Sequence, residues 1–170
     1  MAKARPQKKS APKATRPPGP YLTAALIAEK LLAESDGVTS IVRIVDRIAV
    51  QAEGLAELEK SQDNRMALPL TLVIAFRAGG FRGKSAALIL QEGPSGQSEP
   101  MGASPIDFDG SPDGGFNLKA PLTLKWEGAG RYWYNVYLDN KFVSRVPLTV
   151  EIGKLSPRQP SGNKRGKRPQ

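Results

Sequence analysis

The alternation of hydrophobic and polar positions is most regular from Tyr132 to Val150. A first arm of aromatic and β-branched residues, which suit a half-buried pleated surface, is followed by a second arm in which apolar and polar residues alternate. Asp139-Asn140 lies between the arms, and both residue types tolerate left-handed backbone angles. The pattern therefore predicts a β-hairpin.

The register of this hairpin follows from the requirement that one face be apolar. A two-residue loop would mix apolar and polar residues on that face, so we predict a three-residue loop from Asp139 to Lys141. This loop pairs Leu138 with Phe142, Tyr134 with Val146 and Tyr132 with Leu148. A face this apolar needs a second layer of strands over it.

The segment Leu22 to Leu32 gives conflicting signals. Its composition and the spacing of its apolar residues favour a helix. However, Asp36-Gly37 is a strong turn signal, and Val38 to Val50 after it is rich in β-branched residues. A hairpin needs a partner on each side of its turn, so we predict that Leu22 to Leu32 is extended.

The remaining strands are shorter and are separated by turn signals. Residues 54–60 could form one helical turn or a loop. About eight short strands without βαβ alternation predict an all-β fold, an antiparallel β-sandwich of the Ig-like or jelly-roll-like kind, over residues 20–153. The other expected strands are Leu68 to Arg77, Lys84 to Gln91, a short edge strand around Pro105 to Phe108, and Phe116 to Trp126 with a bulge or bend at Ala120-Pro121.

Charge divides the chain into three parts. Residues 1–19 and 154–170 each hold six basic side chains and no acidic one, and both segments are also rich in Pro. We expect both to be disordered basic tails, because they lack the apolar residues that would offset the entropy of ordering. Residues 20–153 hold 13 basic and 16 acidic side chains, so this domain has a net charge of −3 while the whole chain has +9.

The inventory of reactive side chains excludes several classes of enzyme. The chain has no histidine and no cysteine, so it lacks a Ser-His-Asp triad, a Cys-His dyad and the usual ligands of zinc. No two carboxylates can be placed across a common cleft from the sequence. We therefore expect a non-catalytic protein with no catalytic residue, no cofactor and no metal.

Acidic residues at two places in the chain could mark a polar or metal-binding site. Asp107, Asp109 and Asp113 could hold Ca²⁺, but their spacing departs from the EF-hand loop, and turn formation explains them better. In the predicted strand 38–50, period-two alternation places Arg43 and Arg47 on one face and Asp46 on the other, among isoleucines. A buried Asp46 would need a partner, which we expect to be structural.

The aromatic hairpin also supplies a candidate interaction surface. Trp133 and Tyr137 fall on the face opposite the expected core, and Asn135 and Arg145 could lie beside them. Packing is the more common role of strand aromatics. We nevertheless take Trp133, Asn135, Tyr137 and Arg145 as the residues of a candidate binding surface.

The tails carry the strongest electrostatic signal. Clustered lysine and arginine side chains neutralise phosphates and release counterions, which gives salt-sensitive, sequence-independent contact with RNA or DNA. The tails lack apolar residues for insertion into a bilayer, so nucleic acid is a better partner than a membrane, although the tails could simply confer solubility. No apolar run approaches a membrane span, and we expect a soluble, cytoplasmic protein. The candidate nucleic-acid contacts are Lys8, Lys9, Lys13, Arg16, Lys164, Arg165, Lys167 and Arg168.

Six motifs in chain order carry a resemblance to a known family. They are Glu29-Lys30, Asp36-Gly37, Ile44 to Ile48, Leu68-Pro69-Leu70, Gly130 to Asp139 and Arg145 to Leu148. Over residues 20 to 152 the chain resembles the DUF6941-like family of small bacterial β-sandwich proteins of unknown function. The resemblance implies that Leu22 to Leu32 is a strand, and it supplies no catalytic residue.

These observations favour a β-sandwich that binds another protein or a cell component, with basic tails that add weak nucleic-acid contact. One alternative is a protein that acts primarily on nucleic acid through its tails. A second alternative is a Ca²⁺-dependent lipid- or sugar-binding module that uses Asp107, Asp109 and Asp113. The oligomeric state and the partner are not specified by the residues.

Overall fold

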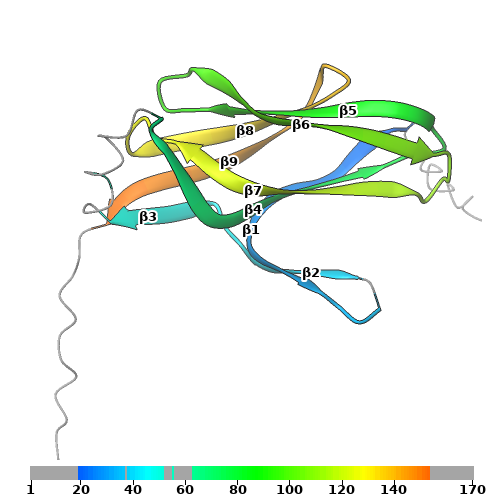
Figure 1. Cartoon of the computed structure of the whole chain (residues 1–170), viewed down its shortest axis with the longest axis horizontal. Coiled ribbons are helices and arrows are strands. Elements are labelled where there is room, and N and C mark those ends of the chain that lie inside the picture. Colours follow the sequence, from blue (N-terminus) through cyan, green and yellow to red (C-terminus); the bar gives the residue numbers. More distant parts are fainter. Residues whose placement is uncertain (1–18, 37, 52–54, 56–62, 154–170) are drawn as a thin grey trace, which may run out of the picture.

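Two β-sheets packed face to face make up the folded part of the protein (Figure 1). The computed structural model describes residues 19–36, 38–51, 55 and 63–153. Within them the first sheet has the strand order β2-β1-β4-β7 and the second has the order β3-β9-β8-β5-β6. The strands are β1 (Tyr21–Ala33), β2 (Thr39–Ile44), β3 (Arg47–Gln51), β4 (Arg65–Arg77), β5 (Arg82–Glu92), β6 (Ser98–Asp109), β7 (Gly115–Lys125), β8 (Gly130–Leu138) and β9 (Lys141–Gly153). The predicted all-β sandwich is confirmed.

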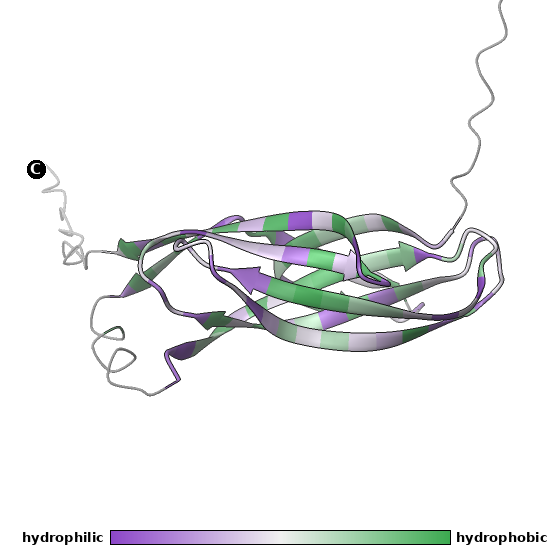
Figure 2. Cartoon of the chain, turned by 90° about the horizontal axis from the view of Figure 1, so that it is seen from above, coloured by the Kyte–Doolittle hydropathy of each residue, from purple (hydrophilic) through white to green (hydrophobic). Residues whose placement is uncertain are grey.

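The core lies between the two sheets. Apolar and polar residues alternate along the strands, as the colouring of Figure 2 shows, and every second side chain points inwards. The largest fully buried side chains are Tyr132, Tyr134, Phe76, Ile27, Leu72, Ile74, Ile106, Leu122, Leu124 and Leu148 with Val136 and Val150. They come from both layers, so the apolar face of the β8–β9 hairpin has the second layer that its sequence requires.

The segment with conflicting signals is the strand β1. Its first part pairs with β4 and its second part pairs with β2, both in antiparallel register. Ile27 and Ala28 are buried at the point where β1 passes from one partner to the other. Partners on both sides outweigh the helical propensity of this segment, and the prediction that it is extended is confirmed.

The predicted single strand from Val38 to Val50 is divided between the two sheets. β2 pairs antiparallel with β1, whereas β3 pairs parallel with β9. Arg43 has a φ of 57°, and the crossing is held by bonds from the Val45 N–H to the Ile27 carbonyl (2.9 Å) and from the Thr149 N–H to the Asp46 carbonyl (2.7 Å). The second sheet is therefore mixed, which corrects the expectation of antiparallel pairing throughout.

The β8–β9 hairpin has the predicted register away from its turn. Tyr132 pairs with Leu148 and Tyr134 with Val146. The prediction of a three-residue loop is wrong, because Leu138 pairs with Lys141 and the loop holds Asp139 and Asn140 alone. Both loop residues have positive φ, 48° and 61°, as a tight I′-type turn requires. A register shift after Val136 then restores an apolar inner face.

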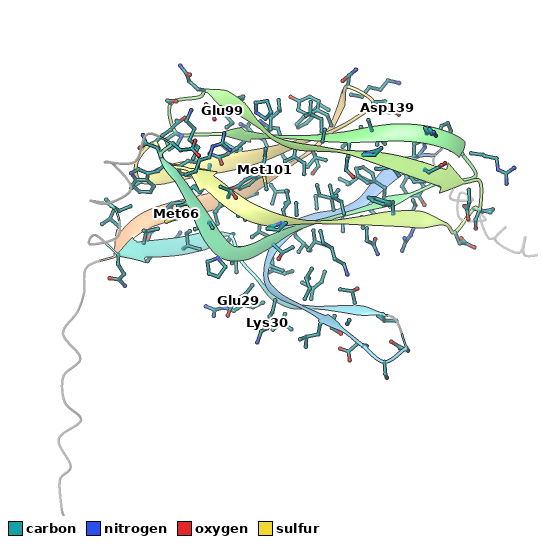
Figure 3. The ribbon with its side chains drawn as sticks, viewed as in Figure 1. Glu29, Lys30, Met66, Glu99, Met101 and Asp139 are labelled. Carbon is teal, nitrogen blue, oxygen red and sulfur yellow. The ribbon has the colours of Figure 1, made fainter. Side chains whose placement is uncertain are left out.

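Asp139 also fastens this turn to the neighbouring strand β5 (Figure 3). Its carboxylate Oδ1 accepts a hydrogen bond from the Ala86 N–H at 2.8 Å, and its own N–H donates to the Ala86 carbonyl at 2.9 Å. Ala86 precedes the residues of β5 that pair with β8. The turn residue therefore extends the β5–β8 pairing beyond the end of β8.

Two other strands differ in detail from expectation. β4 begins before Leu68, and its pairing with β7 shifts register between Ala67 and Thr71, on either side of Pro69. The irregularity expected at Ala120-Pro121 therefore arises from extra residues in the partner strand. β6 is an edge strand as predicted, but its 12 residues are not the short strand that was expected.

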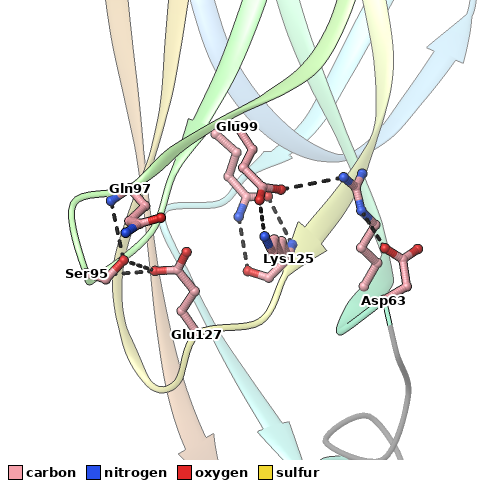
Figure 4. Close-up of polar contacts among 8 residues, drawn as sticks. Asp63, Ser95, Gln97, Glu99, Lys125 and Glu127 are labelled. Atoms are coloured by element: carbon pink, nitrogen blue, oxygen red, sulfur yellow. Dashed lines mark hydrogen bonds and ion pairs between the residues drawn. The ribbon is translucent and has the colours of Figure 1, made fainter.

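A polar cluster joins the two sheets at one end of the sandwich (Figure 4). The buried Gln91 side chain on β5 exchanges two hydrogen bonds of 3.1 Å with the main-chain N–H and carbonyl of Lys125 on β7. Glu99 on β6 forms ion pairs with Lys125 and with Arg65 on β4. The Gln91 amide thus satisfies main-chain groups of the opposite sheet, and we interpret this cluster as structural.

Candidate functional site

The candidate site lies on the outer face of the second sheet, along β8 and β9. Trp133, Asn135 and Tyr137 alternate along β8 with the buried residues Tyr132, Tyr134 and Val136. Because successive side chains of a strand point to opposite faces, the three lie on the side away from the core. Arg145 on β9 is directly opposite Asn135. The structure thus brings three of the four candidate residues together.

Trp133 and Arg145 form the centre of this site. The Arg145 guanidinium carbon lies 4.0 Å from the centre of the Trp133 ring, which is the geometry of a cation–π contact. Arg145 Nη2 also donates to Glu92 Oε1 at 2.6 Å. Asn135 Nδ2 donates to the other oxygen of the same carboxylate at 2.9 Å. Glu92 therefore holds Arg145 over the indole and also binds the amide nitrogen of Asn135, a residue that is only 6% exposed.

The sequence did not point to Glu92. It is the last residue of β5 and pairs with Trp133, so its position depends on the β5–β8 register. No local pattern in the chain specifies which residues two non-consecutive strands place side by side. The available signal was only that an acidic residue directly follows the predicted strand Lys84 to Gln91.

A groove adjoins Trp133 on the side towards β3. It has a volume of about 170 Å³ and is lined by Asp46, Arg47, Arg131, Trp133, Pro147 and Thr149. The Arg131 guanidinium carbon lies 5.7 Å from the Trp133 ring centre. Arg47 forms an ion pair of 3.2 Å with Glu151. We call Glu92, Arg131, Trp133, Asn135 and Arg145 the Trp133 patch, and this groove is its edge.

Tyr137 lies further along β8, near the turn. Its ring contacts that of Phe142 edge to face, with the ring centres 5.7 Å apart. Phe142 is the residue across from it on β9 and is 57% exposed. The two rings extend the apolar part of the outer face towards the β8–β9 turn.

The Trp133 patch can recognise a partner by stacking and hydrogen bonding. An indole with a guanidinium over its ring offers a planar apolar surface beside a charged, multi-donor group, and both suit desolvated contacts in an interface. Among the described residues, the side chains whose pKa is raised are Tyr132 and Tyr134, and both lie in the core instead. For both tyrosines the main cause is burial, which disfavours the charged form.

The other acidic candidates have structural surroundings. Asp109 Oδ1 accepts a hydrogen bond from the Ser111 N–H at 2.9 Å, which is the turn chemistry expected of an aspartate. Asp107 is exposed on β6, opposite Lys84 of β5. In the described ranges no three Asp, Glu, His or Cys side chains gather in a way that could hold a metal ion.

The expectation of a buried Asp46 is wrong. Asp46 is exposed because it lies in the crossing between β2 and β3 and not within a continuous strand. For the same reason Arg43 and Arg47 do not share a face. Arg43 forms an ion pair with Glu29 of β1 at 2.8 Å, while Arg47 belongs to the other sheet.

Several predictions concern residues that the structure does not describe. The candidate nucleic-acid contacts Lys8, Lys9, Lys13, Arg16, Lys164, Arg165, Lys167 and Arg168 lie outside the described residues, as do both expected tails apart from Gly19. The possible helical turn at residues 54–60 also lies outside them, except for Leu55, which is buried. Within the described part, no helix has the length and apolar character to cross a membrane.

Comparisons with known proteins assign neither a family nor a function to the chain. No protein-family model and no curated protein matches the chain. Among solved structures, it is similar to the alkylpurine DNA glycosylase AlkC of Pseudomonas fluorescens bound to DNA containing an abasic site analog, with a TM-score of 0.37 and 8% identity. The match covers 75% of this chain and 30% of that one. We draw neither fold nor function from it, and the resemblance to the DUF6941-like family stays a prediction.

Proposed function

We propose that the protein is a non-catalytic interaction module whose folded domain binds a partner protein through the Trp133 patch, in the cytoplasm of a bacterial cell. The observation that carries the proposal is Arg145 held over Trp133 by Glu92, with a 4.0 Å stacking distance and a 2.6 Å hydrogen bond. Tryptophan and arginine are the residue types most enriched where a few side chains supply most of the binding energy.

The arrangement is also fixed before any partner arrives. Glu92 bonds both Arg145 and Asn135, so the guanidinium and the amide are already oriented. An interface that does not have to order its side chains on binding loses less conformational entropy. The half-buried ring of Trp133, the exposed ring of Phe142 and the groove beside Arg131 give this face both apolar surface and a shallow depression.

We assign the basic tails an accessory role in weak, non-specific contact with nucleic acid. The twelve basic side chains of the two tails account for more than the whole positive charge of the chain, since residues 20–153 have a net charge of −3. A mildly acidic domain has no long-range attraction for phosphates. Contact with RNA or DNA therefore falls to the tails, and contact with protein falls to the sandwich.

The test is affinity purification of the full-length protein in the presence of nuclease, with substitutions in the Trp133 patch. We expect proteins captured by the wild type to be reduced about 30-fold by Trp133→Ala, the loss typical of a central interface residue. Arg145→Ala should act in the same direction. The matched control is Lys84→Ala, which removes an exposed cation from the other end of β5 and should retain the same proteins.

A thermal unfolding curve of each variant separates loss of binding from loss of folding. The proposal is wrong if the captured proteins are the same for the wild type and Trp133→Ala while both remain folded. It is also wrong if nuclease removes everything that the wild type captures.

A further inference from the structure

The hairpin formed by β1 and β2 exposes apolar side chains that the fold does not use. Figure 1 shows it extending away from the two layers, and Glu29 and Lys30 mark where β1 leaves them (Figure 3). Among the described residues seven large hydrophobic side chains are exposed, and five of them belong to this hairpin: Leu32, Val38, Ile41, Val42 and Ile44. Clusters of this kind usually mark an interaction surface.

β2 is also the least protected edge among the described strands. The edge strand β6 carries Pro100 and Pro105, and the edge strand β7 carries Pro121, which hinder the addition of another strand. Lys119 of β7 reaches β2 instead, where its Nζ donates to Thr39 Oγ1 at 3.1 Å. The fourth edge strand, β3, has only five residues. β2 contains neither proline nor lysine. Its one charged residue, Arg43, is paired with Glu29 of the same hairpin.

The main-chain N–H and C=O groups of β2 point alternately towards β1 and towards the open edge of the sheet. The Glu34 N–H donates to the Val38 carbonyl at 2.8 Å, so this pair is a hydrogen-bonded one. Bonded and non-bonded pairs alternate along an antiparallel ladder. Ser40 and Val42 therefore direct their main-chain groups towards β1, whereas Thr39 and Ile41 direct theirs towards the open edge.

We propose that β2 pairs antiparallel with β2 of a second copy of the chain, about a two-fold axis at Ile41. In this register the Ile41 N–H and carbonyl bond to those of Ile41 in the second copy. Ser40 then lies opposite Val42, and Ile41 of one copy lies beside Ile41 of the other, so that apolar side chains of both copies meet at the axis. The first sheets of the two copies join into one continuous sheet.

The pairing closes after two copies. A two-fold contact uses the same edge on both partners, so no β2 edge remains for a third copy. The proline residues on the edge strands β6 and β7 disfavour further strand addition through those edges. A contact of this length is small for a protein interface, so we expect a dissociation constant on the order of 1–100 μM. This interface is distinct from the Trp133 patch and does not depend on the function proposed for it.

Cysteine crosslinking tests the register, because the wild-type chain has no cysteine. In the full-length protein, Ile41→Cys places two thiols opposite each other across the axis, with Cα atoms about 5.5 Å apart, within reach of a disulfide. Val42→Cys is the matched control: Val42 has the same 41% exposure as Ile41, but its counterpart lies on a diagonal about 7–8 Å away. Mild oxidation should give a covalent dimer for Ile41→Cys and little for Val42→Cys.

Sedimentation of the full-length protein tests the interface without crosslinking. We expect a monomer–dimer equilibrium, and Ile41→Lys should raise its dissociation constant at least about tenfold because it places two like charges at the axis. Ile152→Lys, at a second exposed isoleucine on β9, should change it less than about twofold. A wild-type monomer at all concentrations, or equal crosslinking at positions 41 and 42, would overturn the proposal and leave the edge to a strand of another protein.

Discussion

Two tyrosines on β8 have the same degree of burial and opposite hydrogen-bond status. Both Tyr132 and Tyr134 are fully buried. The Tyr132 hydroxyl accepts from the Glu127 N–H at 2.9 Å and donates to the Gly128 carbonyl at 2.8 Å, which ties down the loop before β8. Within the part of the chain that the structure describes, the Tyr134 hydroxyl has no hydrogen-bond partner. A buried polar group without a partner destabilises the folded state, whereas a paired one does not.

Removing each hydroxyl should therefore change stability in opposite directions. We expect Tyr134→Phe to raise the free energy of unfolding by about 1 kcal/mol, because an unpaired hydroxyl leaves the core. Tyr132→Phe should lower it by about 1–2 kcal/mol, because it breaks two hydrogen bonds. Urea denaturation of the two variants beside the wild type measures both. A loss of stability in Tyr134→Phe would show that its hydroxyl has a stabilising contact.

The same residues predict how stability depends on pH. Burial raises the pKa of Tyr132 and Tyr134 above the ordinary value of 10.0, so both stay neutral in the folded chain at a pH where the unfolded chain ionises. Their contribution is constant below about pH 9 and declines above pH 10, by up to about 1.4 kcal/mol per pH unit for a tyrosine that stays neutral in the folded chain. Denaturation curves between pH 8 and 11 should show a shallower decline for Tyr134→Phe. Identical slopes would contradict this account.

Among the elements, the β8–β9 turn is the one whose geometry most directly reflects its two residues. Asn140, with a φ of 61°, is in a region that glycine occupies without strain. Asn140→Gly should therefore raise stability by a few tenths of a kcal/mol or leave it unchanged, whereas Asn140→Val should lower it by about 1–2 kcal/mol. Thermal unfolding measures both variants. A valine variant as stable as the wild type would mean that the turn can adopt another loop length.

The sequence predicted elements well where neighbours in the chain are also neighbours in space. The alternation in Tyr132 to Val150 predicts the hairpin and its register, and the turn signal at Asp36-Gly37 correctly outweighs the helical propensity of β1. The loop length was wrong because the prediction assumed a regular ladder, and the register shift after Val136 allows both the tight turn and the apolar face.

Features that depend on non-consecutive strands could not be predicted from the sequence. The division of residues 38–50 between two sheets has no local signal, since both halves have the same strand-forming composition. The exposure of Asp46 follows from this division. The role of Glu92 likewise depends on the β5–β8 register, although Trp133, Asn135 and Arg145 were expected together from the hairpin alone.

At the scale of the whole molecule, the two proposed interaction surfaces belong to different sheets. The Trp133 patch lies on the outer face of the second sheet, and the open edge of β2 belongs to the first. A dimer formed through β2 would therefore leave both Trp133 patches uncovered. Two patches on one dimer would increase the avidity for a partner that presents two copies of its own binding site.

The central claim is that the folded domain, and not the pair of tails, carries recognition. The most direct test compares four full-length proteins after nuclease treatment: the wild type, Trp133→Ala, a tail variant and the combination of the two. The tail variant replaces Lys8, Lys9, Lys13, Arg16, Lys164, Arg165, Lys167 and Arg168 with glutamine.

We predict that the wild type and the tail variant capture the same proteins and that both proteins carrying Trp133→Ala lose them. Without nuclease, nucleic acid should accompany the wild type and be depleted from the tail variant. The opposite result, in which the tail variant loses its protein partners and Trp133→Ala keeps them, would contradict the account and assign recognition to the tails.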